Sequence, residues 1–214
     1  MKTFIQFISE EEIQKKAVVA FGRHQTFTNG HEKVLKTVEG EANEQGAEAH
    51  FITSHSEGTS SNPVPAATKV KLIKKVAKPS TKVYSSDNES PSLLHQLTKI
   101  HNSGVQHVTY VGGSDRVGPM TDLIKKYNGV KGKHGYFNFK SINSKSSGER
   151  DPDADVESTQ GVSGTKVRAM ARAGDTEGVK KAIPKALHPH VKEIMGHIQS
   201  IKENVDIENT DSIY

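Results

Sequence analysis

The run Ala17-Val18-Val19-Ala20-Phe21 is apolar at every position and is followed at once by Gly22. A strand with one wet face alternates apolar and polar residues, whereas a strand buried on both faces is apolar throughout, as in a parallel sheet covered by helices. The glycine allows the chain to turn tightly where the strand ends. The run therefore predicts a central, fully buried strand of an α/β fold.

The rest of the chain repeats this pattern, because short apolar runs alternate with amphipathic helical stretches. Such alternation favours a parallel sheet with helical crossovers. We expect strands at 17–21, 49–53, 82–84, 105–111 and near 136–139. We expect helices at 31–45, 66–76, 92–102, 120–127, 164–173, 175–182 and 188–203.

Two separate segments carry residue types that suit phosphate binding. Gly22-Arg23-His24-Gln25-Thr26-Phe27-Thr28-Asn29-Gly30-His31 follows the first strand and leads into a helix, and Val162-Ser163-Gly164-Thr165-Lys166-Val167-Arg168 opens a later helix. Backbone N–H groups and the positive end of a helix bind phosphate at such positions. Neither G-x-G-x-x-G after the first strand nor G-x-x-x-x-G-K-[ST] is present, which disfavours dinucleotide redox chemistry and P-loop phosphoryl transfer.

The first segment resembles the G-R-F-x-P-x-[HT]-x-G-H motif of the nucleotidylyltransferase family, and the second is similar to its I-S-x-T-x-x-R motif. The V-S-G-T-x-x-R motif, with Ile183-Pro184 shortly afterwards, resembles the corresponding sequence of archaeal-type nicotinamide-mononucleotide adenylyltransferases. Asn62-Pro63-Val64, the 111–117 stretch and the 148–155 stretch resemble cytidylyltransferase-like proteins of tailed phages. His24 replaces the usual aromatic residue and Thr26 the usual proline.

This resemblance implies a Rossmann-like open parallel sheet of about five strands in the order 3-2-1-4-5, followed by C-terminal helices. It implies catalytic roles for His31 on the α-phosphate, for Arg168 on the β- and γ-phosphates, and for Thr28, which stands where many relatives have a first histidine. The resemblance also implies a set of nucleotide-binding residues: Gly22, Arg23, Gln25, Gly30, Ser163 and Thr165. The candidates for contact with the second substrate are Asp115, Lys69 and Asn62.

The implied reaction is transfer of AMP from ATP to a phosphate-bearing acceptor, with release of pyrophosphate. Nicotinamide mononucleotide is the favoured acceptor, which would place the protein in NAD synthesis. Two alternatives stay open: a CTP-dependent cytidylyltransferase, and a non-catalytic protein that keeps the fold to bind a nucleotide or a partner chain. We expect Mg²⁺ to arrive with the triphosphate, held mainly by phosphates and water, with no metal site built by the protein.

The amino-acid composition limits the classes of partner and the locations that we expect for the protein. The net charge of +4 fits dispersed, solvated lysines or a polyanionic ligand, and the scattered basic residues with only 6% aromatics disfavour nucleic acid. No apolar stretch of about 18 residues indicates a membrane span, and the N-terminal residues lack the apolar core of a secretory signal. The absence of cysteine excludes disulfides. We expect a cytoplasmic protein (host cytoplasm if phage-encoded) that could form homo-oligomers.

The expected boundaries are an N-terminal extension at 1–16, a nucleotidyltransferase domain at 17–203 and a flexible tail at 204–214. Ser9 with Glu12 predicts a capping box for a short helix through Lys16. Asp115 lies in a predicted turn after the fourth strand, either on the substrate or simply solvated. The 144–160 stretch predicts a long loop, whose alternating aspartates Asp151, Asp153 and Asp155 are more typical of a solvated loop than of a cation site.

Overall fold

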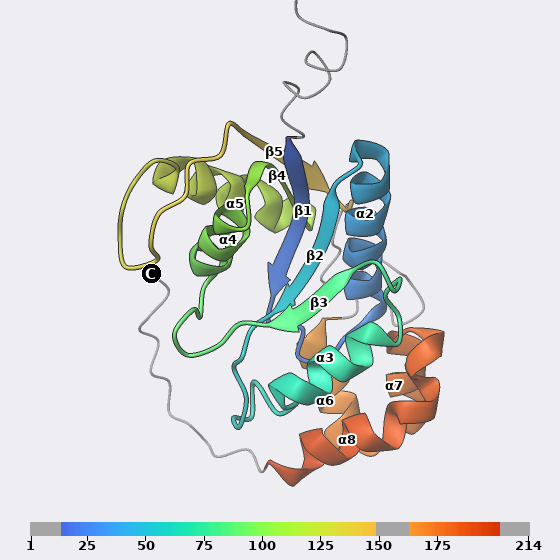
Figure 1. Ribbon diagram of the computed structural model, residues 1–214. Helices are drawn as coiled ribbons and strands as arrows, with labels where there is room; N and C mark the ends of the chain where they lie inside the picture. Colours follow the sequence, from blue (N-terminus) through green and yellow to red (C-terminus); the bar gives the residue numbers. More distant parts are fainter. Residues whose placement is uncertain (1–13, 149–162, 202–214) are drawn as a thin grey trace, which may run out of the picture.

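The computed structural model describes residues 14–148 and 163–201, and its centre is a five-stranded sheet (Figure 1). All four strand pairs are parallel, and the order is β3-β2-β1-β4-β5. The predicted fold class and strand order are therefore confirmed. The strands are β1 (Lys15–Gly22), β2 (Glu48–Thr53), β3 (Lys82–Ser85), β4 (Val105–Gly112) and β5 (Ser141–Ser146).

The central strand β1 is buried on both faces, as its uninterrupted apolar sequence predicts. Val18 and Ala20 belong to one hydrophobic core, while Ala17 and Val19 belong to the other, and none of the four is more than 2% exposed. Because neighbouring side chains point to opposite faces of a strand, one short run contributes to two cores. The sheet is thus the middle layer of three.

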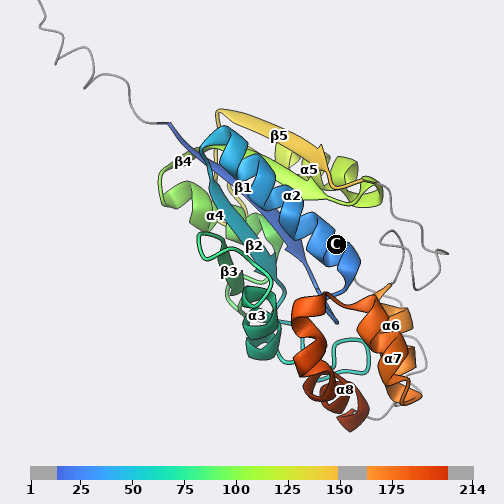
Figure 2. The ribbon, with the colours of Figure 1, turned by 90° about the vertical axis from the view of Figure 1, so that its right-hand side faces the viewer.

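Helices cover both faces of the sheet. The first core joins the sheet to α2, α3, α6, α7 and α8, and the second joins it to α4 and α5. The two views together show α2 and α4 on opposite sides of the strands (Figures 1 and 2). The helices are α2 (Asn29–Gln45), α3 (Ala66–Lys74), α4 (Leu93–Asn102), α5 (Ser114–Tyr127), α6 (Gly164–Arg172), α7 (Thr176–Ala182) and α8 (Val191–Ser200), with a 3₁₀ helix η1 (Lys185–His190) before α8.

The C-terminal helices complete the first core at the end of the sheet where the strands finish. Val167, Val179 and Ile194 are fully buried there together with Leu35 of α2. Asn29, the first residue of α2, donates a hydrogen bond from its side chain to the carbonyl of Lys181, 2.8 Å away. Figure 2 shows α6, α7 and α8 grouped beside the start of α2. These helices therefore fix the second motif near the first.

The predicted strand near 136–139 is wrong. The fifth strand is Ser141–Ser146, which includes the start of the predicted long loop. Phe137 and Phe139 produced the false signal because they are buried, in the second core, but from a loop. The real strand is a polar edge strand with four exposed residues, so it carries no apolar pattern.

Two predicted helix boundaries also need correction. Helix α5 begins at Ser114 rather than near Met120, so Asp115 lies in its first turn and not in a loop; Gly118 and Pro119 hid this start because both residues usually interrupt helices. At the other end of the chain, Lys15 and Lys16 belong to β1 and not to a helix. Ser9 and Glu12, on which that helix prediction rested, lie outside the described residues, as does the predicted tail.

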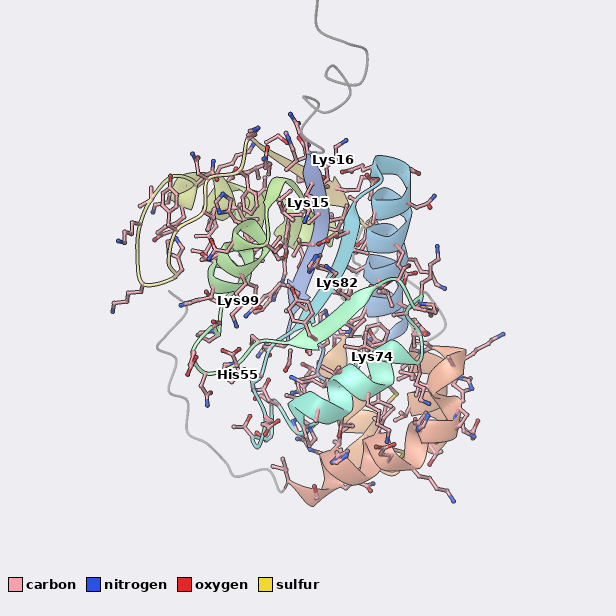
Figure 3. The ribbon with its side chains drawn as sticks, viewed as in Figure 1. Lys15, Lys16, His55, Lys74, Lys82 and Lys99 are labelled. Carbon is pink, nitrogen blue, oxygen red and sulfur yellow. The ribbon has the colours of Figure 1, made fainter. Side chains whose placement is uncertain are left out.

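The exposed lysines are spread over the surface. Figure 3 shows Lys15 and Lys16 where β1 begins, Lys99 on α4, and Lys74 and Lys82 near α3 and β3. Lys82 and Lys99 form ion pairs with carboxylates, at 2.9 Å from Glu48 and Asp87. Within the described part of the chain, no helix is long and apolar enough to cross a membrane.

Candidate functional site

A cavity of about 240 Å³ opens at the carboxyl ends of the strands. Open parallel sheets bind ligands at this edge, where the strand order reverses, here between β1 and β4. The cavity is lined by both predicted motifs, although more than a hundred residues separate them in the sequence. The predicted site residues that line it are Gly22, Arg23, Gln25, Thr28, Gly30, His31, Asp115, Ser163, Thr165 and Arg168.

The turn after β1 is shaped by an unusual backbone conformation at His24. Its φ of 47° is left-handed, which costs an L-residue about 1–2 kcal/mol. The conformation folds the imidazole back over Gly22 and stacks it on Phe51 of β2, with ring centroids 4.6 Å apart. A methyl group on Gly22 would stand 2.8 Å from His24 Nε2, so any larger residue at this position would displace the imidazole.

Gln25 fixes the same turn to the 54–65 loop. Its amide nitrogen donates to the carbonyls of Ser56 and Val64, at 2.9 and 3.1 Å. Its amide oxygen accepts from the Val64 N–H at 2.9 Å. The Gln25–Thr26 peptide bond is cis. Although Thr26 replaces the proline of the family motif, three buried or half-buried hydrogen bonds hold the turn in place.

Thr28 orients the imidazole of His31. Thr28 is the N-cap of α2, and its backbone N–H donates to His31 Nδ1 at 3.1 Å. Since a backbone amide can only donate, Nδ1 is an acceptor, and the proton of the neutral ring lies on Nε2. His31 thus presents a defined N–H donor from a residue that lines the cavity.

Arg168 and Gly164 connect the second motif to the first. The guanidinium of Arg168 donates to the carbonyl of Gln25 at 2.8 Å and to the hydroxyl of Thr165 at 3.1 Å. Gly164 packs so closely against the same carbonyl that a Cβ atom would overlap it. Ser163 caps α6 by accepting from the Lys166 N–H at 3.1 Å. The two motifs therefore meet at one carbonyl oxygen, that of Gln25.

The cavity is electropositive. Arg23, Lys33, Arg116 and Arg168 line it, and Asp115 is the only carboxylate among the described lining residues. Burial, together with the charges of Arg172 and Arg23, lowers the pKa of Arg168 below its usual range, but a guanidinium stays protonated at neutral pH. The first turns of α2, α5 and α6 also reach the cavity, and helix N-termini attract anions. The arrangement suits a polyphosphate.

Lys69 and Asn62 lie outside the cavity lining. The ammonium of Lys69 is buried and donates to the carbonyls of Ser54 at 2.5 Å, Ser56 at 3.1 Å and Arg23 at 3.4 Å. Burial lowers its pKa to about 8. The Asn62 side chain donates to the Thr59 hydroxyl at 3.1 Å. Both residues brace the loops behind the cavity.

The sequence motifs did not point to Lys33 and Arg116. Lys33 lies one helical turn after Gly30 on α2, so helical spacing from the motif could have found it. Arg116 was hidden because the start of α5 was misplaced. Among the described residues, no group of three or more His, Asp or Glu side chains is placed to hold a metal ion. The aspartates at 151, 153 and 155 lie outside that part of the chain.

No protein-family model matches the chain, and neither does any curated protein sequence. Solved structures do resemble it. Thermotoga maritima TmcAL bound with alpha-thio ATP aligns with a TM-score of 0.51 and 9% identity over 86% of this chain. Plasmodium falciparum nicotinic acid mononucleotide adenylyltransferase complexed with APC aligns with a TM-score of 0.51 and 13% identity over 89% of this chain and 100% of its own.

This chain spans about half of the TmcAL chain, 56% of its length. At such low identity the likeness concerns the fold: the chain has the α/β architecture of proteins solved with ATP analogues. The fold and the electropositive cavity agree on where an anionic ligand would bind.

Proposed function

We propose that this protein transfers a nucleotidyl group from a nucleoside triphosphate, preferably ATP, to a phosphate-bearing acceptor. The observation that carries the proposal is the junction at Gln25. Its carbonyl binds Arg168, and its neighbours Thr28 and His31 form the start of α2. An imidazole N–H donor and a guanidinium thus line one cavity that also holds three helix N-termini.

In the proposed step, a phosphate oxygen of the acceptor forms a bond to the α-phosphorus of the triphosphate. The bond from that phosphorus to the oxygen bridging the α- and β-phosphates breaks, and pyrophosphate leaves with the electron pair. This chemistry depends on positioning and charge stabilisation rather than on a covalent nucleophile. His31 Nε2–H donates to the α-phosphate oxygens as their charge grows.

Arg168 binds the departing pyrophosphate in this scheme, because a guanidinium can donate two parallel hydrogen bonds to phosphate oxygens. Its two contacts, to Gln25 and Thr165, hold its fork in place before the ligand arrives. Mg²⁺ would enter with the triphosphate, held mainly by its phosphates and by water.

The cationic residues Lys33 and Arg116 support an anionic acceptor. Nicotinamide mononucleotide is our first candidate for the acceptor. The support is the V-S-G-T-x-x-R motif at 162–168 and the structural likeness to a nicotinic acid mononucleotide adenylyltransferase. CTP with an alcohol phosphate is the second, because the 111–117 stretch, which contributes Gly112, Asp115 and Arg116 to the cavity, resembles the phage cytidylyltransferase-like proteins.

Pyrophosphate release tests the proposal. The protein is incubated with Mg²⁺, each nucleoside triphosphate in turn, and a panel of phosphorylated acceptors. We expect turnover with ATP and nicotinamide mononucleotide, and a loss of about 10²–10³-fold in kcat for His31→Ala, the range for removal of one transition-state donor. His95→Ala, on α4 at the other face of the sheet, is the control and should keep full activity.

Turnover with CTP alone would select the cytidylyltransferase. Nucleotide binding without pyrophosphate release from any acceptor would refute the transferase and favour a binding protein.

A further inference from the structure

His24 is a buried titratable group that the proposed reaction leaves unused. It is 6% exposed and lines the cavity, and its ring stands edge-on to that of His31, with centroids 4.9 Å apart. No described residue hydrogen-bonds to its Nδ1, which is buried. Packing alone does not account for a histidine here, because a phenyl ring would stack equally well on Phe51 and bury no polar atom.

The two ring nitrogens of His24 have different surroundings. Nδ1 has no partner in the described structure, and the aromatic rings of Phe27 and Phe51 flank the imidazole. Nε2 lies over Gly22, which itself lines the cavity. A buried lone pair without a partner is tolerated better than a buried N–H without one. The proton of the neutral ring therefore belongs on Nε2, the nitrogen that lies over the cavity-lining Gly22.

The His24 ring is held in its neutral form. Burial lowers its pKa well below the usual value, and the nearby ammonium of Lys69 lowers it further by repulsion. Aromatic stacking on Phe51 and the left-handed backbone fix the orientation of the ring. His24 thus offers a fixed, uncharged N–H donor on a ring that lies beside the ring of His31.

We propose that His24 is a further catalytic residue, whose Nε2–H donates a hydrogen bond to a non-bridging oxygen of the phosphoryl group under attack, together with His31. This inference rests on the proposed nucleotidyl transfer. No proton changes hands: the hydrogen bond strengthens as charge gathers on the phosphoryl oxygens, and the acceptor and pyrophosphate are bonded and released as described above. Thr28 supplies a hydroxyl where many relatives have a histidine, so residue 24 provides the second imidazole of this cavity.

Two substitutions of His24 distinguish the effect of the N–H donor from the effect of the aromatic ring. His24→Phe keeps the stack on Phe51 and removes the donor; we expect kcat for pyrophosphate release to fall about 10²-fold with little change in the KM for ATP. His24→Asn tolerates the left-handed backbone and restores an N–H. We expect it to recover about tenfold of the lost kcat. Full kcat in His24→Phe would overturn the proposal, and so would equal losses in both variants with unchanged melting temperatures.

A second measurement does not depend on turnover or on the folding of a variant. In the wild-type chain with ¹⁵N-labelled histidine, NMR reports the tautomer of His24 and the effect of added ATP on Nε2. We expect an Nε2-protonated ring whose Nε2 signal moves when ATP and Mg²⁺ are added. An unchanged signal at saturating ATP would overturn the inference. If the wild-type protein releases no pyrophosphate with any acceptor, the proposed function fails, while this titration still decides whether His24 contacts the nucleotide.

Discussion

Gly164, at the start of α6, packs directly against the carbonyl of Gln25 in the turn after β1. Replacing Gly164 by alanine tests whether this contact positions the second motif. The new Cβ would overlap the carbonyl oxygen of Gln25 and stand 3.3 Å from Arg168 Nη1. A backbone oxygen cannot swing aside as a long side chain does. The start of α6 must therefore move away from the turn after β1, and Ser163, Thr165 and Arg168 move with it.

The size of the effect follows from this overlap. A displacement on the order of 1 Å at a positioned group costs about 10²-fold in rate, which corresponds to about 2.7 kcal/mol of transition-state stabilisation. The bond between Arg168 and the Gln25 carbonyl lengthens in the same movement. Overpacking in addition lowers the free energy of unfolding by about 1–3 kcal/mol. We therefore expect Gly164→Ala to fold and to lose about 10²-fold in kcat/KM.

The assay is pyrophosphate release with ATP and the best acceptor, together with urea unfolding. Gly40→Ala is the matched control, because Gly40 lies within α2 and a Cβ there meets no atom within 4 Å. That change should leave activity intact and raise stability by about 0.5–1 kcal/mol. If Gly164→Ala keeps activity within twofold of the control, the contact at Gln25 does not position Arg168, and the reasoning is refuted.

Two further predictions concern Lys69 and Gln25, whose side chains hydrogen-bond to the loops around the cavity. Burial lowers the pKa of Lys69 from 10.5 to about 8, so between these values the unfolded chain binds more protons than the folded one, and wild-type stability rises with pH in that window. In Lys69→Met this rise should be absent from urea unfolding series at pH values of about 8 to 10.5, and identical pH profiles for the two proteins would contradict the assignment. Gln25→Leu leaves the N–H and carbonyl of Val64 and the carbonyl of Ser56 without their partner, and it should lower the free energy of unfolding by about 2–4 kcal/mol. A loss below about 1 kcal/mol would show that water or a rearranged loop replaces those bonds.

The sequence predicted the parts of this fold whose residues face apolar surroundings. The runs at 17–21 and 105–111 contribute buried residues to both hydrophobic cores and were predicted correctly, as was the amphipathic helix α2. The sequence also predicted that 22–31 and 162–168 serve one site, and the structure places 22–31 and the described part of the second segment, 163–168, on one cavity.

Secondary structure was predicted wrongly where buried residues do not form a strand, or where a strand is exposed. Phe137 and Phe139 are buried without forming a strand, whereas β5 is a strand without being buried. Prediction also failed where contacts are tertiary. Nothing local to Lys69 shows that its ammonium binds three carbonyls, and nothing local to His24 shows that its ring lies beside His31. Such contacts depend on how the loops after β1 and β2 pack together.

The first hydrophobic core joins β1, α2, β2 and α3 to helices that follow every strand of the sheet in the sequence, α6, α7 and α8. During synthesis on the ribosome, every strand of the sheet emerges before those helices do, with one face of the sheet still short of its cover. Arg168 and the N-terminus of α6 are missing at that stage, so a nascent chain holds the cavity lining from β1, α2, β4 and α5 but lacks the lining from α6. The helix that supplies Arg168 to the cavity is therefore also one of the helices that cover the first core after the sheet has been made.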